Sequence, residues 1–129
     1  MIKNLRIGIS TRMVKNERFD ENIDIISHDW INLFEQLNFI PILIPNILND
    51  VLFFLEKMNL DGIILSGGDN IGDFPDRDKT ESKIIKFSIQ ENIPLFGVCR
   101  GMQVINNFFN GIIQNNVTSE HVRKNHEIL

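Results

Sequence analysis

The stretch Leu95-Phe96-Gly97-Val98-Cys99-Arg100-Gly101-Met102-Gln103 combines an apolar run, two glycines and the only cysteine of the chain. The apolar run predicts a buried strand, and the residues after Cys99 predict the start of a helix. Gly97 and Gly101 lie two positions on either side of Cys99, which is the spacing of a nucleophile elbow with a thiol at its apex. Glycine lets the backbone close at such a turn without a Cβ clash. We therefore expect a strained turn at the carboxyl edge of a sheet, with Cys99 at a helix N-terminus that favours the thiolate.

A second interpretation of Cys99 stands beside this one. A lone cysteine in an apolar run is commonly a small buried hydrophobic side chain, and the G-x-C-x-G spacing taken alone is a weak signal. The strand expected before the motif and the helix expected after it favour the catalytic interpretation.

Composition limits the class of protein. The 129 residues are enough for one domain, residues 1–129, with 43% hydrophobic and 23% charged residues, as in soluble globular proteins. The net charge of -4 argues against a large basic surface, so we expect no nucleic-acid partner. A single cysteine excludes an internal disulfide and is typical of a reducing compartment. Without a signal-peptide pattern or an apolar run of membrane-spanning length, we expect a cytoplasmic protein with no membrane partner.

Apolar runs and helical spacing alternate along the chain. Four apolar runs predict strands over residues 5–9, 39–45, 61–66 and 93–98. Apolar residues at helical spacing predict helices over residues 23–37, 46–58, 78–91 and 100–109. This alternation predicts an α/β fold with a parallel, doubly wound sheet and right-handed crossovers.

Individual residues refine this expectation. Pro41 indicates that the second strand is an edge strand or that the proline nitrogen faces away from the ladder, and Asn46 is a candidate N-cap of the second helix. Asp78 and Glu81 have the spacing of a capping box that opens the third helix. The polar residues 12–22 predict a loop, and residues 111–114 are a candidate fifth strand.

A carbonyl attacked by Cys99 would need amide donors for the resulting oxyanion. The N–H of Arg100, directly after the nucleophile, is one candidate. The strand-end pair Gly67-Gly68 can bring bare backbone close to a substrate and supply the other, although a plain turn is the alternative interpretation. Arg12 lies in the loop after the first strand, where it could bind a substrate carboxylate or be a solvated arginine.

These motifs resemble those of the class I glutamine amidotransferase superfamily, within it the γ-glutamyl hydrolase type that includes γ-glutamyl-γ-aminobutyrate hydrolases. The matching residues are the runs 60–71 and 96–103, Arg77-Asp78 with Glu81, and later Gly111 and Ile113-Gln114. The resemblance implies a flavodoxin-like, three-layer α/β/α fold and a Cys99 nucleophile, with an oxyanion hole from Gly68 and Arg100. It places Gly67 and Gln103 at the bound glutamyl group. It implies hydrolysis of a γ-glutamyl amide through a glutamyl-thioester, without a metal or organic cofactor.

One feature of the family pattern is missing. The family's base is a later histidine followed two positions on by glutamate, and none of His28, His121 and His126 has this context. His126 is adjacent to Glu127 and matches instead a histidine upstream of the catalytic one. We therefore expect the domain to be incomplete at its C-terminal side, with little activity alone. An uncovered sheet edge would favour self-association or a partner subunit.

Three functional hypotheses remain open at this stage. The first is an enzyme acting on a small-molecule γ-glutamyl-amine, γ-glutamyl-nucleotide or glutamine, either alone or as the glutaminase part of an amidotransferase. The second is a catalytically incomplete binding or assembly module. The third is a redox-sensing thiol, which leaves Gly67-Gly68 and Gln103 unexplained.

Overall fold

The computed structural model describes residues 3–114. The strands are β1 (Arg6–Ser10), β2 (Arg12–Asn16), β3 (Glu21–Ile25), β4 (Ile40–Ile44), β5 (Gly62–Leu65) and β6 (Leu95–Gly97). The helices are α1 (His28–Gln36), α2 (Val51–Met58), α3 (Pro75–Gln90) and α4 (Arg100–Phe108).

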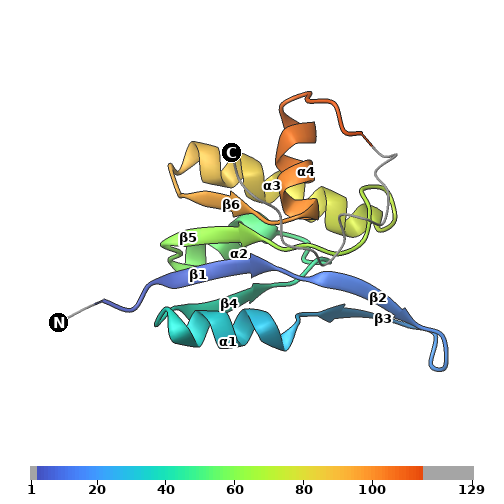
Figure 1. Ribbon diagram of the computed structural model, residues 1–129, viewed down its shortest axis with the longest axis horizontal. Helices are drawn as coiled ribbons and strands as arrows, with labels where there is room; N and C mark the ends of the chain where they lie inside the picture. Colours follow the sequence, from blue (N-terminus) through green and yellow to red (C-terminus); the bar gives the residue numbers. More distant parts are fainter. Residues whose placement is uncertain (1–2, 115–129) are drawn as a thin grey trace, which may run out of the picture.

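The main sheet has four parallel strands in the order β4-β1-β5-β6 (Figure 1). With the helices as crossovers, this is the order of a flavodoxin-like sheet, and it confirms the predicted α/β fold class. The two central strands are buried on both faces, which explains why they are continuous apolar runs. Pro41 lies on the edge strand β4, as predicted, opposite Ile7 of β1.

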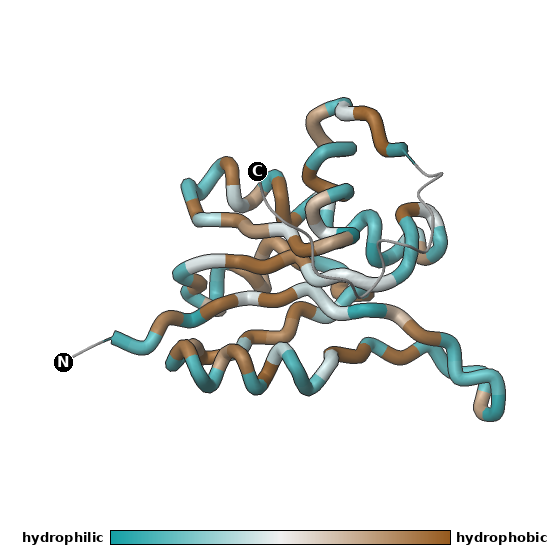
Figure 2. The backbone as a smooth tube through the Cα atoms, in the orientation of Figure 1, coloured by the Kyte–Doolittle hydropathy of each residue, from teal (hydrophilic) through white to brown (hydrophobic). Residues whose placement is uncertain are grey.

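Helices cover both faces of the sheet and create two clusters of buried apolar residues. On one face, Phe34 of α1 packs with Ile7 and Ile9 of β1. On the other face, α2, α3 and α4 pack on β5. The buried apolar residues of this second cluster are Ile44, Val51, Leu55, Leu60, Ile63, Leu65, Ile84, Ile85, Phe87 and Val104. The fold is therefore the predicted three-layer arrangement, with the brown apolar segments of Figure 2 concentrated on the strands.

The segment predicted as a loop is instead an antiparallel hairpin of β2 and β3, which projects from the main sheet (Figure 1). Met13 is buried, and Val14 pairs with Ile23, so β-branched and apolar residues stabilise the hairpin despite its polar tip. The prediction of a helix from residue 23 was wrong, because this hairpin continues to Ile25. Helix α1 begins at His28, where the Ser27 side chain caps the N–H of Asp29 at 3.3 Å.

The cap predictions were also wrong. Asp50, and not Asn46, caps α2 by accepting a hydrogen bond of 3.0 Å from the N–H of Phe53. Asn46 is buried, and its amide donates to Thr11 and to Asp24, which ties the β4 end to the hairpin.

Helix α3 begins earlier than predicted, at Pro75, a residue suited to the first helical turn. The expected capping box is absent, because Asp78 and Glu81 lie inside α3 and bind Arg100. Residues 111–114 form no strand. Among the helices of residues 3–114, none is both long and apolar enough to cross a bilayer.

Candidate active site

The turn between β6 and α4 has the predicted elbow geometry. Cys99 is its apex, with φ 55° and ψ -113°, a combination that non-glycine residues rarely adopt. It occupies the N-cap position of α4, and its side chain is exposed. The structure thus presents the thiol at the carboxyl edge of the sheet and at the positive end of a helix.

The two flanking glycines are required by close backbone packing. A Cβ atom added to Gly97 would lie 2.6 Å from the carbonyl carbon of Gly101. A Cβ atom added to Gly101 would lie 2.7 Å from the carbonyl carbon of Leu65, at the end of β5. The first turn of α4 therefore packs directly on the backbone of both neighbouring strands, which fixes the direction in which Cys99 points.

The Gly67-Gly68 loop lies against the elbow. A Cβ atom added to Gly67 would be 3.1 Å from Cys99 Cβ and 3.7 Å from its Sγ. Gly68 has φ +86°, a conformation that favours glycine. The two strand ends that carry the Gly67-Gly68 loop and the elbow therefore lie side by side.

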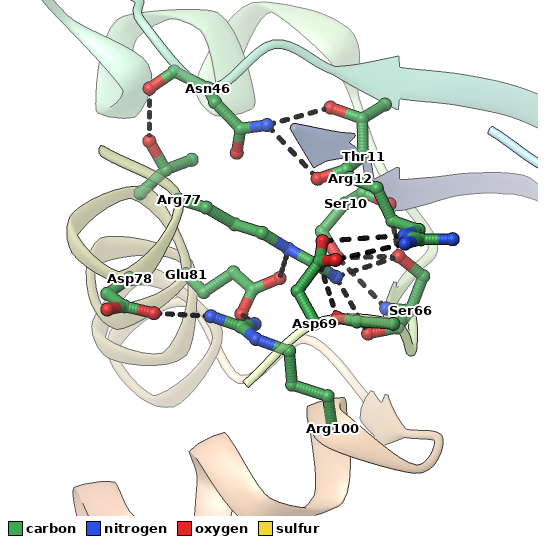
Figure 3. A network of polar contacts seen from close by, with 12 residues as sticks. Ser10, Thr11, Arg12, Asn46, Ser66, Asp69, Arg77, Asp78, Glu81 and Arg100 are labelled. Atoms are coloured by element: carbon green, nitrogen blue, oxygen red, sulfur yellow. Dashed lines mark hydrogen bonds and ion pairs between the residues drawn. The ribbon is translucent and has the colours of Figure 1, made fainter. Parts of the chain in front are cut away.

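Beneath this loop lies the buried guanidinium of Arg77 (Figure 3). Its Nη1 donates to Gly68 O at 2.7 Å, and its Nη2 donates to Ser66 O at 3.0 Å and to Gly67 O at 3.1 Å. Three consecutive carbonyls after β5 are thus satisfied by one side chain from α3. Burial lowers the pKa of Arg77, while Glu81 and Asp69 favour its charged form.

Glu81 joins Arg77 to the elbow (Figure 3). One carboxylate oxygen accepts from Arg77 Nε at 3.0 Å, and the other accepts from Arg100 Nη1. Asp78 accepts from Arg100 Nη2. Sequence reasoning named Arg100 only for its backbone N–H and missed this network. The available signal was the spacing of Arg77 and Glu81, which places the two side chains on one face of a helix.

Arg12 is a partly solvated surface residue whose guanidinium pairs with an acidic side chain. It lies at the start of β2, and its Nη2 pairs with Asp69 Oδ1 at 2.9 Å. The hydrogen bond that Arg12 donates to Asp69 raises the pKa of Arg12. Its side chain lies over Gly68, where an added Cβ would be 2.6 Å from Arg12 Cδ, and it lines a pocket of about 230 Å³ with Val98.

Gln103 lines a different pocket, of about 540 Å³, together with Asn70, Ile71, Asn107 and Ile113. The structure therefore divides the predicted substrate-binding residues between two pockets. Of the histidines, His28 is exposed on the first turn of α1, and the other two lie outside the described residues. Residues 3–114 contain no group of three or more side chains placed to hold a metal ion.

The sequence also matches known proteins. A sequence model of the family described as Peptidase C26 matches residues 6–128. The chain belongs to the Peptidase C26 family. Its Cys-Arg-Gly-Met-Gln elbow and its Gly-Gly loop are the parts of this Peptidase C26 chain that carried the resemblance to class I glutamine amidotransferases.

Three relatives of this Peptidase C26 chain illustrate the range of names. A γ-glutamyl-CDP-amidate hydrolase of Campylobacter jejuni is 31% identical over 131 residues, which cover 95% of this chain and 62% of that protein. A putative glutamine amidotransferase of Schizosaccharomyces pombe is 40% identical over 47% of this chain and 30% of its own length. A glutamine-hydrolysing GMP synthase of Plasmodium falciparum is 33% identical over 52% of this chain and 12% of its own length. The chain spans less than two thirds of each of these relatives.

Proposed function

We propose that this chain carries the nucleophile half of an active site that hydrolyses a γ-glutamyl amide. The observation that carries the proposal is the packing of the Gly67-Gly68 loop against Cys99 at the apex of the elbow. A buried structural cysteine needs neither a strained, exposed apex nor a glycine loop beside it. Family membership and the names of the relatives support amide hydrolysis over a redox thiol.

The reaction follows from the order of these groups. The Cys99 sulfur forms a bond to the γ-carbonyl carbon, and the carbonyl oxygen becomes an oxyanion that the N–H groups of Gly68 and Arg100 would bind. Collapse breaks the C–N bond, the amine leaves with a proton, and a glutamyl-thioester remains. Water then hydrolyses the thioester and regenerates the thiol. No residue between 3 and 114 is assigned as the general base.

The extent of the matches supports one substrate class over another. The γ-glutamyl-CDP-amidate hydrolase aligns with 95% of this chain, whereas the GMP synthase aligns with 52%. We therefore favour a γ-glutamyl amide of the γ-glutamyl-nucleotide or γ-glutamyl-amine type. The glutaminase part of an amidotransferase is the second candidate. Gln103 and the amide-lined pocket beside it are proposed to bind the glutamyl group, and Arg12 lies at the other pocket. A reactive thiol of this kind suits the reducing cytoplasm, where we place the protein.

Labelling of the thiol tests the proposed function without requiring turnover. We expect the chloroketone analogue of glutamine to alkylate Cys99, with loss of chloride, and we expect excess glutamine to slow the reaction at least about 10-fold by mass action. Peptide mass spectrometry locates the adduct, and Cys99→Ser removes the only thiol of the chain. Labelling that glutamine does not slow would indicate a merely reactive thiol, and no labelling would indicate a non-catalytic module.

The part of the sheet face that α1 leaves uncovered, next to β5 and β6, supports self-association. A groove of about 680 Å³ lies between α1 residues such as Trp30 and Leu33 and strand residues such as Ile64 and Phe96. Phe96 is 65% exposed although it lies in a strand, and its strand β6 is at the sheet edge. We propose that a second copy of this chain covers the groove, because an exposed apolar edge favours pairing.

Phe96→Lys is expected to shift this chain from dimer or larger species toward monomer in sedimentation velocity, because a charge in the groove opposes its burial. Phe19→Lys is the matched control, since Phe19 is also 65% exposed but lies at the tip of the hairpin. A monomeric parent chain at all concentrations, or an equal effect of both substitutions, would contradict the proposed interface.

A further inference from the structure

Both halves of the proposed oxyanion hole are attached to the same carboxylate. Arg77 holds the Gly67-Gly68 loop, Arg100 belongs to the elbow, and Glu81 accepts from both guanidinium groups. We propose that Arg77 and Glu81 are positioning residues, which fix the two amide donors relative to each other and to Cys99. This inference rests on the proposed function, since it assigns a role to residues behind the same site.

Arg77 fixes the first donor, the N–H of Gly68, by binding the carbonyl oxygen on the other side of the same peptide group. The Gly67–Gly68 peptide is trans, so the N–H of Gly68 points opposite to the C=O of Gly67. That carbonyl accepts from Arg77 Nη2 at 3.1 Å. Because the carbonyl faces the buried guanidinium, the N–H faces away from it. Contacts to Ser66 O and Gly68 O hold the neighbouring peptides as well, so the loop cannot rotate one peptide alone without losing a buried hydrogen bond.

The second donor is fixed in the same way at the start of α4. The carbonyl of Cys99 accepts from the N–H of Gln103 at 3.2 Å, so the N–H of Arg100 points away from the helix, where it has no intrahelical acceptor. The Arg100 side chain then extends from this residue to Glu81 and Asp78 on α3. Glu81 therefore connects the two donors, because it accepts hydrogen bonds from both Arg77 and Arg100.

The burial of the Arg77–Glu81–Arg100 network argues for a role beyond stability. The side chains of Arg77 and Glu81 are fully buried, and that of Arg100 is 2% exposed. Buried ion pairs contribute little net stability compared with apolar residues of similar volume, but they can fix one arrangement over others. An oxyanion hole needs this, because its donors must already lie at the position that the developing charge will occupy.

Glu81→Gln tests the positioning role with little change in shape. We expect alkylation of Cys99 by the chloroketone analogue of glutamine to slow about 10- to 100-fold, because the attacked ketone oxygen uses the oxyanion hole. Alkylation by iodoacetamide, which forms no oxyanion in the hole, should stay within about twofold of the parent rate. Glu91→Gln, the same substitution at an exposed position just after α3, should change neither rate. Equal slowing of both reagents in Glu81→Gln, or of neither, would overturn the positioning role.

Amide NMR tests the inference even where the chloroketone does not react. Glu81→Gln is expected to shift the amide resonances of both Gly68 and Arg100, although Glu81 accepts no bond from either amide. Arg77→Lys, which keeps the charge but loses the planar fork, should act mainly on Gly68 and serves if Glu81→Gln does not fold. Unchanged Gly68 and Arg100 resonances in a folded variant would refute the coupling. A parent chain that glutamine does not protect would instead refute the proposed function.

Discussion

Gly101→Ala is expected to lower the free energy of unfolding by about 4 kcal/mol or more, which is at the upper end for a single substitution. The added methyl group would meet backbone atoms of Leu65, lying 2.7 Å from its carbonyl carbon and closer still to its oxygen. That oxygen already accepts from the N–H of Val98 at 3.0 Å, and Leu65 is fully buried. The strand cannot retreat, so α4 must move away and carry Cys99 with it.

The sign of this prediction distinguishes packing from helix propensity. Gly101 lies in α4, where replacing glycine by alanine would by propensity alone stabilise the helix by about 1 kcal/mol. The expected destabilisation is therefore opposite to the propensity effect. Gly62→Ala is the matched control, because an added Cβ on β5 would meet only the flexible end of Ile7 at 3.3 Å and Pro94 O at 3.6 Å.

Urea unfolding monitored by the fluorescence of Trp30, the only tryptophan, measures both variants. Trp30 lies on α1, and a coincident transition in far-UV circular dichroism is required to show that its signal follows loss of the whole fold. We expect Gly62→Ala to stay within about 1 kcal/mol of the parent chain, as for a substitution that side-chain adjustment can accommodate. A Gly101→Ala chain as stable as the parent would show that the elbow does not need this close approach.

The sequence predicts the fold where burial alone dictates the pattern. The two central strands are covered on both faces, so β5 is apolar throughout and β1 is apolar from Ile7 to Ile9, a pattern that the sequence reveals. The β2–β3 hairpin was missed because more than half of its residues are polar, and because its strand pairing is not visible as a period in the sequence. Asn46 was misassigned for a related reason. Its side chain bonds the hairpin instead of the helix that follows it, which depends on tertiary contacts.

The same distinction applies to the candidate site. The elbow and the Gly-Gly loop were predictable, because glycine at a fixed spacing reports a local backbone requirement. The buried ion network was not predictable, because Asp78 and Glu81 also have the residue types and spacing of a capping box. Only the packing of α3 against both loops turns these carboxylates toward Arg100.

Arg77→Met is expected to lower the free energy of unfolding by about 3–5 kcal/mol, the range observed when one partner of a buried ion pair is removed. Methionine replaces the aliphatic stem of Arg77 but not its guanidinium, so the loss combines the missing charge and hydrogen bonds with a void at the end of a buried side chain. The buried carbonyl of Ser66 and the half-buried carbonyls of Gly67 and Gly68 would lose their donor, and Glu81 would keep only Arg100. Arg12 cannot replace Arg77, because it lies over the loop and is 44% exposed.

A double-mutant cycle separates the carbonyl contacts from the ion pair. If the uncompensated charge of Glu81 dominates the loss, adding Glu81→Gln to Arg77→Met should recover part of it, so that the two substitutions are not additive. If the three carbonyls dominate, the double variant should be no more stable than Arg77→Met alone. Lys86→Met, at an exposed position of the same helix, controls for the loss of a cation and should change stability by no more than about 0.5 kcal/mol. An Arg77→Met chain within that margin of the parent would show that the loop after β5 holds its conformation without the guanidinium. The Gly67–Gly68 amide would then be set by the backbone alone.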